Sequence, residues 1–174
     1  MLELVDFIRL FSQHGRLVSL PQLLAVAGKD TEKIVDAVQE YICLILAPEY
    51  RDLKMRLSDG EHFFYSDRHM VDSYANRWLA LQRGEVVATL AQQIREASCL
   101  HTAVLEASVL CYPPYNLDVE AQQALRQQLL AMPEYDDIRY GIGRDGKGYY
   151  FSTDGLSPEY ARVLADYDPF EWSC

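Results

Sequence analysis

Pro48-Glu49-Tyr50-Arg51-Asp52-Leu53-Lys54 returns further along the chain as Pro133-Glu134-Tyr135-Asp136-Asp137-Ile138-Arg139. The next segment is duplicated too, because Asp59-Gly60-Glu61-His62-Phe63-Phe64-Tyr65-Ser66 is matched by Asp145-Gly146-Lys147-Gly148-Tyr149-Tyr150-Phe151-Ser152, after the insertion of one residue before the second Asp-Gly. Self-similarity that keeps Pro, Asp-Gly, an aromatic triplet and Ser in register indicates a duplicated structural unit. The sequence therefore predicts two copies of one small module.

The length and composition of the chain are typical of two small globular domains. Its 174 residues are 49% hydrophobic and 24% charged, and a copy of roughly 80 residues is close to the lower limit for an independent core. No run approaches the ~18 apolar residues that cross a bilayer. The segment 1–6 lacks the basic region and cleavage site of a secretory signal. We therefore expect a cytoplasmic protein.

The turn residues and the helical periodicity of the first copy predict three helices and a β-hairpin. The expected elements are a helix over Leu4–Phe11, a short helix from Ser19-Leu20-Pro21 to Gly28, a third helix from Asp30 or Thr31 to Pro48, and strands at Leu53–Leu57 and His62–Tyr65. Residues 70–83 have the apolar stripe of a connecting helix, which we expect to pack between the two halves.

The second copy shows the same order of elements. The expected elements are helices over Val86–Ile94, Thr102–Leu110 and Val119–Met132, a hairpin of Asp137–Ile142 and Gly148–Ser152, and a final helix from Ser157 through Leu164. Asp118 is placed to cap the third of these helices. The tail, Asp166–Cys174, is acidic and aromatic. The predicted domains are 1–69, a linker helix at 70–84, and 85–174.

Three helices followed by a β-hairpin give each half a resemblance to a winged-helix domain, and the pair is similar to tandem winged-helix proteins. The resemblance implies a mostly helical α+β fold with two winged-helix-like units joined by a linker helix. This superfamily includes DNA-binding transcription regulators. It also includes acidic tandem modules that bind proteins, such as the accessory subunits of SMC-kleisin complexes and the ESCRT-II subunits. Fold alone leaves both functions open.

DNA binding would need cationic third helices or wings. Residues 84–174 carry six Lys or Arg against 14 Asp or Glu, a net charge of −8, whereas residues 1–83 have a net charge of −2. The third helices are also net negative over 29–40 and 118–128. The wings are more basic, although acidic residues on the same hairpins cancel much of their charge. The candidate phosphate contacts are Arg51, Lys54, Arg56, Arg139, Arg144 and Lys147.

Aromatic side chains are the candidates for contacts with a partner protein. The middle member of each aromatic triplet points away from the first and third members, because side chains alternate across a strand. We expect the first and third members to face the core, and the middle ones to be covered by the linker helix or presented to a partner. The aromatic residues of the tail either pack back on the domain or anchor in a partner's pocket. The candidate partner-binding residues are Phe64, Tyr150, Phe170 and Trp172.

No arrangement of residues predicts a catalytic, metal or cofactor site. Cys99 and His101 are two residues apart on a helix and do not face each other. The G-x-G-x-x-G at 141–146 precedes a strand, whereas dinucleotide binding requires a helix there. The four cysteines lack the C-x-x-C spacing of zinc sites, so we expect free thiols that are mostly buried. These thiols are Cys43, Cys99, Cys111 and Cys174.

Two functions therefore compete on the sequence alone. The first is a non-enzymatic adaptor or regulatory subunit whose acidic and aromatic surfaces bind another protein or a second copy of the chain. The second is a DNA-binding transcription regulator that uses the basic wings. The charge balance favours the first.

Overall fold

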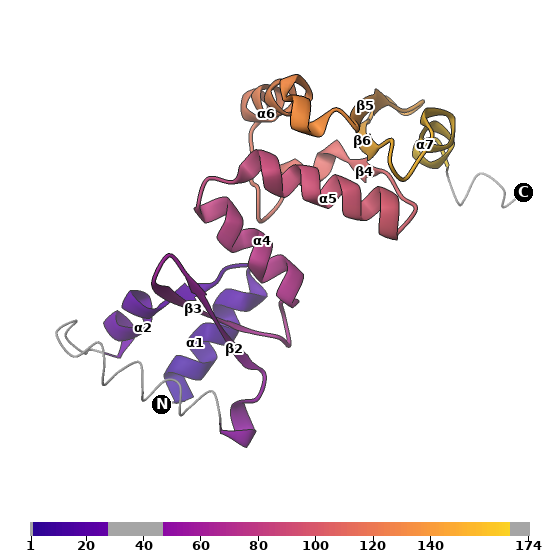
Figure 1. Ribbon diagram of the computed structural model, residues 1–174. Helices are drawn as coiled ribbons and strands as arrows, with labels where there is room; N and C mark the ends of the chain where they lie inside the picture. Colours follow the sequence, from indigo (N-terminus) through magenta and orange to yellow (C-terminus); the bar gives the residue numbers. More distant parts are fainter. Residues whose placement is uncertain (1, 28–46, 168–174) are drawn as a thin grey trace, which may run out of the picture. The chain divides into compact units, whose positions relative to one another are not determined.

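The computed structural model describes residues 2–27 and 47–167 (Figure 1). These residues form a mostly helical α+β structure with two three-stranded antiparallel sheets, which confirms the predicted fold class. The chain divides into two compact units, Met1–Gln82 and Arg83–Cys174. The third helix expected in the first copy, the Gly28 expected to end its second helix, and the C-terminal tail from residue 168 lie outside the described residues.

The described part of the first unit begins with two helices and ends with a third that comes after the β-hairpin. Its elements are α1 (Leu2–Gln13), β1 (Val18–Ser19), α2 (Leu20–Val26), η2 (Pro48–Tyr50), β2 (Leu53–Ser58), β3 (Glu61–Ser66) and α4 (Asp72–Gln82). The hairpin turns at Asp59 and Gly60, whose φ angles of 51° and 80° are in the left-handed region that an Asp-Gly turn supplies. The predicted hairpin is therefore confirmed.

The second unit repeats this order. Its elements are α5 (Val86–Leu100), β4 (Leu105–Glu106), η3 (Ala107–Cys111), α6 (Val119–Ala131), η4 (Pro133–Tyr135), β5 (Ile138–Ile142), β6 (Gly148–Ser152) and α7 (Pro158–Ala165). The Asp118 carboxylate accepts a hydrogen bond from the backbone N–H of Ala121, at 2.8 Å, and caps α6 as predicted. The Ser157 hydroxyl caps α7 in the same way.

Each sheet contains a short third strand that the sequence did not predict. β1 pairs with β3, and β4 pairs with β6, so the strand orders are β1-β3-β2 and β4-β6-β5. The helix expected over Thr102–Leu110 is wrong for this reason. Leu105 and Glu106 are extended and pair with Tyr150 and Tyr149, which leaves only the 3-10 turn η3 after them.

The helix expected as a linker packs on the outer face of the first sheet. Ala75 and Leu79 of α4 are buried in one cluster with Leu17, Tyr65 and Met70. The second unit has an equivalent cluster, in which α7 packs on the opposite face of the hairpin from α6 (Figure 1). Its buried members are Tyr149, Phe151, Leu156 and Ala161. The duplicated unit therefore extends beyond the hairpin and ends with a helix that covers the outer face of its sheet.

Candidate functional site

The basic residues of the first wing are held by acidic neighbours in the same unit. The Lys54 ammonium lies 3.1 Å from the Asp67 carboxylate. The Arg56 guanidinium lies 2.6 Å from the Asp72 carboxylate and 5.9 Å from the centroid of the Tyr65 ring. Hydrogen bonds to Asp72, first from the Tyr65 hydroxyl at 2.5 Å and also from Arg56, lower the pKa of this carboxyl. The third candidate, Arg51, is exposed.

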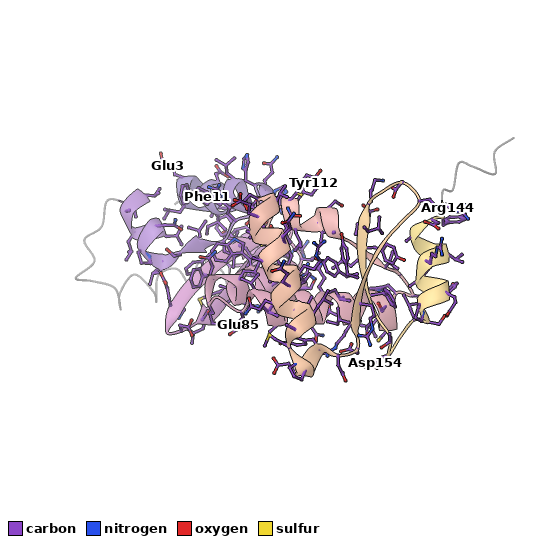
Figure 2. All side chains as sticks on the ribbon, turned by 90° about the horizontal axis from the view of Figure 1, so that it is seen from above. Glu3, Phe11, Glu85, Tyr112, Arg144 and Asp154 are labelled. Carbon is purple, nitrogen blue, oxygen red and sulfur yellow. The ribbon has the colours of Figure 1, made fainter. Side chains whose placement is uncertain are left out.

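The basic residues of the second wing are engaged in a similar way. Arg144 lies beside α7, at the opposite end of the β5–β6 hairpin from Asp154 (Figure 2), and its Nε is 3.3 Å from the carboxylate of Asp166. The Lys147 ammonium lies 2.8 Å from the Asp145 carboxylate. The Arg139 guanidinium donates hydrogen bonds to the backbone carbonyls of Asp136 and Ile138.

The third helix of the second unit presents few charges to solvent. Leu125 and Leu129 of α6 are buried, whereas Val119 and Leu130 are 68% and 44% exposed. The one cationic side chain of α6, Arg126, lies 4.4 Å from the centroid of the Tyr140 ring. The exposed face of α6 is therefore a neutral to acidic surface rich in glutamine and small apolar residues.

The structure corrects the placement of the two middle aromatic residues. Phe64 is 1% exposed and Tyr150 is 2% exposed, so neither can contact a partner in the folded units. Phe64 packs in the core formed by α1, α2 and β2. Burial raises the pKa of Tyr150 to about 12. The reason for the error is that helices cover both faces of each sheet. Phe170 and Trp172 lie outside the described residues.

A buried polar network that the sequence analysis missed occurs in both units. In the first, Arg9 of α1 donates two hydrogen bonds to Asp52, at 3.0 and 2.7 Å, and the Ser66 hydroxyl donates a third, at 2.8 Å. The Ser12 hydroxyl of α1 accepts a hydrogen bond from the Ser66 backbone N–H, at 2.8 Å. The network ties the first helix to both strands of the hairpin.

The second unit repeats this network with equivalent residues. Arg95 of α5 donates two hydrogen bonds to Asp137, at 3.0 and 2.5 Å, and the Ser152 hydroxyl donates another, at 2.6 Å. The Ser98 hydroxyl accepts from the Ser152 backbone N–H, at 2.9 Å. Both carboxylates are buried and accept several hydrogen bonds, which fits a structural role.

Both networks should make the folded state sensitive to acid. Hydrogen bonds from the arginine, together with one from the serine, lower the pKa of Asp52 and of Asp137 to about 2. An unfolded Asp has a pKa of about 3.9, so the stabilisation is complete above about pH 4 and is lost as the pH falls through about 2. We expect a loss of about 2 kcal/mol per carboxylate over this window. Urea unfolding at a series of pH values, followed by circular dichroism, measures it, and an unfolding free energy that stays constant across the window would contradict the assignment.

The second unit has a cleft beside α7. It has a volume of about 270 Å³ and lies between the residues around β4, the start of β6 and the end of α7. Its apolar lining includes Val104, Tyr149 and Leu164, and Glu106 and Lys147 contribute polar groups. Tyr167 also lines it, although this side chain is 64% exposed.

α7, which contributes Leu164 and Ala165 to this cleft, also exposes apolar side chains to solvent. Tyr160 and Val163 are 47% and 60% exposed and follow each other at helical spacing toward Tyr167. We call Tyr160, Val163 and Tyr167 the α7 stripe and the adjoining depression the α7 cleft. The helical part of the stripe could have been recognised from the sequence, because Tyr160 and Val163 occupy positions of the last helix that do not face the core.

The described residues contain no cluster of metal-ligating side chains, and they contain two exposed cysteines. Within residues 2–27 and 47–167, no group of three or more His, Cys, Asp or Glu side chains could hold a metal ion. Cys99 and Cys111 are free thiols, as predicted, but they are exposed, whereas we expected buried ones. Cys43 and Cys174 lie outside the described residues. Of the helices that the structure describes, none is both long and apolar enough to cross a membrane.

The second unit also defines the family of the chain. Residues 84–173, which are more than half of the sequence, match the family model of the YdhW C-terminal domain. The chain therefore belongs to the YdhW C-terminal domain family. Neither a curated protein nor a solved structure matches it. The matched residues contain the α7 cleft, the α7 stripe and the second polar network.

Proposed function

We propose that the chain is a non-enzymatic adaptor or regulatory subunit, built from two winged-helix-like repeats, that binds another protein through its second unit. The observation that carries this proposal is the α7 stripe. Tyr160 and Val163 are exposed on α7, whose Ala161 is in the core, and Tyr167, two residues beyond the helix, is exposed and lines the cleft. Exposed large apolar side chains near a concavity are typical of sites that bind proteins.

The ion pairs made by the basic residues of the two hairpins favour this proposal over DNA binding. Of the six candidate phosphate contacts, Lys54, Arg56, Arg144 and Lys147 lie within 3.3 Å of a carboxylate in their own unit. Phosphate contacts by these side chains would have to compete with those carboxylates. Affinity for DNA comes mostly from cations that neutralise phosphates. A cytoplasmic location is part of the proposal and is supported by two exposed free thiols, which persist in a reducing compartment.

Site-specific photo-cross-linking in the host cell tests the proposal. A photoreactive residue in place of Val163 should form a discrete protein adduct. The same residue in place of Leu57, which is 65% exposed on the first wing, is the matched control and should not form that adduct. The adduct formed from position 163 should also disappear when Tyr160→Asp is added. If positions 163 and 57 gave the same adducts, the second unit would not be the binding surface.

A DNA-binding measurement directly tests the alternative function, that of a DNA-binding transcription regulator. Fluorescence anisotropy with a random-sequence duplex should show no tight, salt-sensitive binding by the full chain. If tight binding appeared and weakened steeply between low and physiological salt, the protein-binding proposal would be wrong. Arg56→Ala and Arg139→Ala would then each weaken the binding and flatten its salt dependence.

A further inference from the structure

The α7 cleft exists because the second repeat carries smaller side chains than the first at equivalent positions. α4 and α7 cover the outer faces of equivalent sheets, and Ala75 and Ala161 are buried at the same point of each helix. Where α4 has Trp78 and Leu79, α7 has Leu164 and Ala165.

The first unit fills this space with its own side chains. Trp78 packs edge-on against Phe63, with 5.9 Å between the ring centroids, and Leu79 is 5% exposed. In the second unit both Leu164 and Ala165 line the cleft, beside the ring of Tyr149. The exchange of Trp and Leu for Leu and Ala removes much of the side-chain volume that would cover this part of the sheet. The second repeat therefore has an opening where the first packs Trp78 and Leu79 against its sheet.

The size of the cleft identifies the kind of group that it can hold. Sites for small molecules and cofactors usually have volumes of about 300–1,000 Å³. The volume of the α7 cleft, about 270 Å³, is at the lower end of that range, and a single large side chain would fit it. Its lining mixes polar and apolar groups, and the apolar part includes Val104, Tyr149 and Leu164. An anchor residue that inserts into such a pocket is the usual centre of a protein–protein contact.

The net charge of the second unit favours a basic segment around this anchor. Glu106 is exposed at the cleft, while Lys147 pairs there with Asp145. The second half of the chain carries six Lys or Arg against 14 Asp or Glu, a net charge of −8. A positively charged segment would be attracted to this unit, whereas an acidic one would be repelled.

We propose that the α7 cleft binds one large apolar side chain, aromatic or leucine-sized, from a basic segment of a partner protein. This inference rests on the proposed protein-binding function and names the chemistry of its partner. The anchor packs between Tyr149, Leu164 and Val104, and the α7 stripe covers the neighbouring residues of the segment. Basic residues on either side of the anchor face Glu106 and the acidic surface of the unit.

Titration of the ¹⁵N-labelled full chain with a synthetic peptide tests the inference. The probe has one central tryptophan and two lysines on each side. The amide resonances of residues 102–104, 147–149 and 164–167 should show the largest, saturable shifts. Replacement of the tryptophan by alanine, or of the lysines by glutamates, should weaken binding by about tenfold or more.

Variants that close the cleft make the test specific. Leu164→Trp and Ala165→Leu introduce the residues that fill the first unit, so they should abolish the shifts and leave the unfolding free energy unchanged or higher. Ala124→Leu makes the same chemical change as Ala165→Leu on the exposed face of α6 and should retain wild-type binding. Glu106→Gln should weaken binding by roughly twofold to fivefold, as expected for one exposed charge.

Three outcomes would overturn the inference. One is the absence of saturable shifts at the cleft, and another is equal binding of the alanine peptide. The third is that the peptide binds a chain truncated after Tyr167 but does not bind the full chain. This result would mean that residues 168–174 occupy the cleft themselves. The photo-cross-link at position 163 separates this inference from the proposed function. If Ala165→Leu kept that adduct, the chain would bind its partner without the cleft, and only the cleft inference would fall.

Discussion

Asp137→Ala is expected to lower the free energy of unfolding of the second unit by about 3 kcal/mol, because it breaks a buried ion pair and leaves two donors without their acceptor. The Asp137 side chain is 8% exposed, whereas that of Arg95 is 35% exposed. The Ser152 hydroxyl, which is fully buried, donates to the same carboxylate. Urea unfolding followed by circular dichroism, with hydrogen exchange of the α5 and β6 amides, measures the loss in this unit.

Two comparisons separate the network from general effects of charge removal. Asp145→Ala removes an exposed carboxylate that pairs with Lys147 and accepts a hydrogen bond from its backbone N–H at 2.9 Å, and it should lower the free energy of unfolding by no more than about 1 kcal/mol, because water screens an exposed pair. Asp52→Ala should reproduce the large loss in the first unit, since Arg9 and Ser66 hold Asp52 in the same way. If Asp137→Ala and Asp145→Ala had the same effect, the network would have no special role in holding the helix to the hairpin.

The sequence predicted those elements whose signals are local. Asp59-Gly60 supplies the left-handed backbone of a hairpin turn, and Asp118 and Ser157 supply the side-chain oxygens that cap α6 and α7. The predictions failed where a distant strand decides the conformation. Leu105 and Glu106 lie in a stretch that also suits a helix, but they are extended because they pair with β6.

The sequence analysis missed the functional features because they depend on contacts between distant residues or on differences in side-chain volume between the two repeats. Arg95 and Asp137 are 42 residues apart, and no local pattern connects them. The inward placement of Tyr150 results from a second layer of helix on the sheet, which the alternation of a strand cannot reveal. The α7 cleft would have been visible if the repeat had been aligned beyond Ser66 and Ser152. Such an alignment sets Trp78 opposite Leu164 and shows the loss of volume.

Tyr150→Ala is expected to destabilise the second unit by about 3–5 kcal/mol, the range for removal of a large buried aromatic ring. The ring is 2% exposed and lies 5.1 Å, centroid to centroid, from that of Tyr140. The Arg126 guanidinium of α6 in turn lies against the Tyr140 ring. Loss of the Tyr150 ring therefore leaves a cavity among β5, β6 and α6, and it should lower the urea midpoint of this unit.

Ile142→Ala is the matched control, because this side chain stands on the neighbouring strand and is 65% exposed. It should change the free energy of unfolding by no more than about 0.5 kcal/mol. Phe64→Ala and Leu57→Ala form the same pair in the first unit, with exposures of 1% and 65%. The opposite result would be a Tyr150→Ala variant that has the same free energy of unfolding as Ile142→Ala but no longer forms the cross-linked adduct. Tyr150 would then contact the partner directly. It would also mean that the hairpin exposes its middle aromatic residue to solvent. That result would contradict the packing of helices on both faces of the sheet, on which the α7 cleft depends.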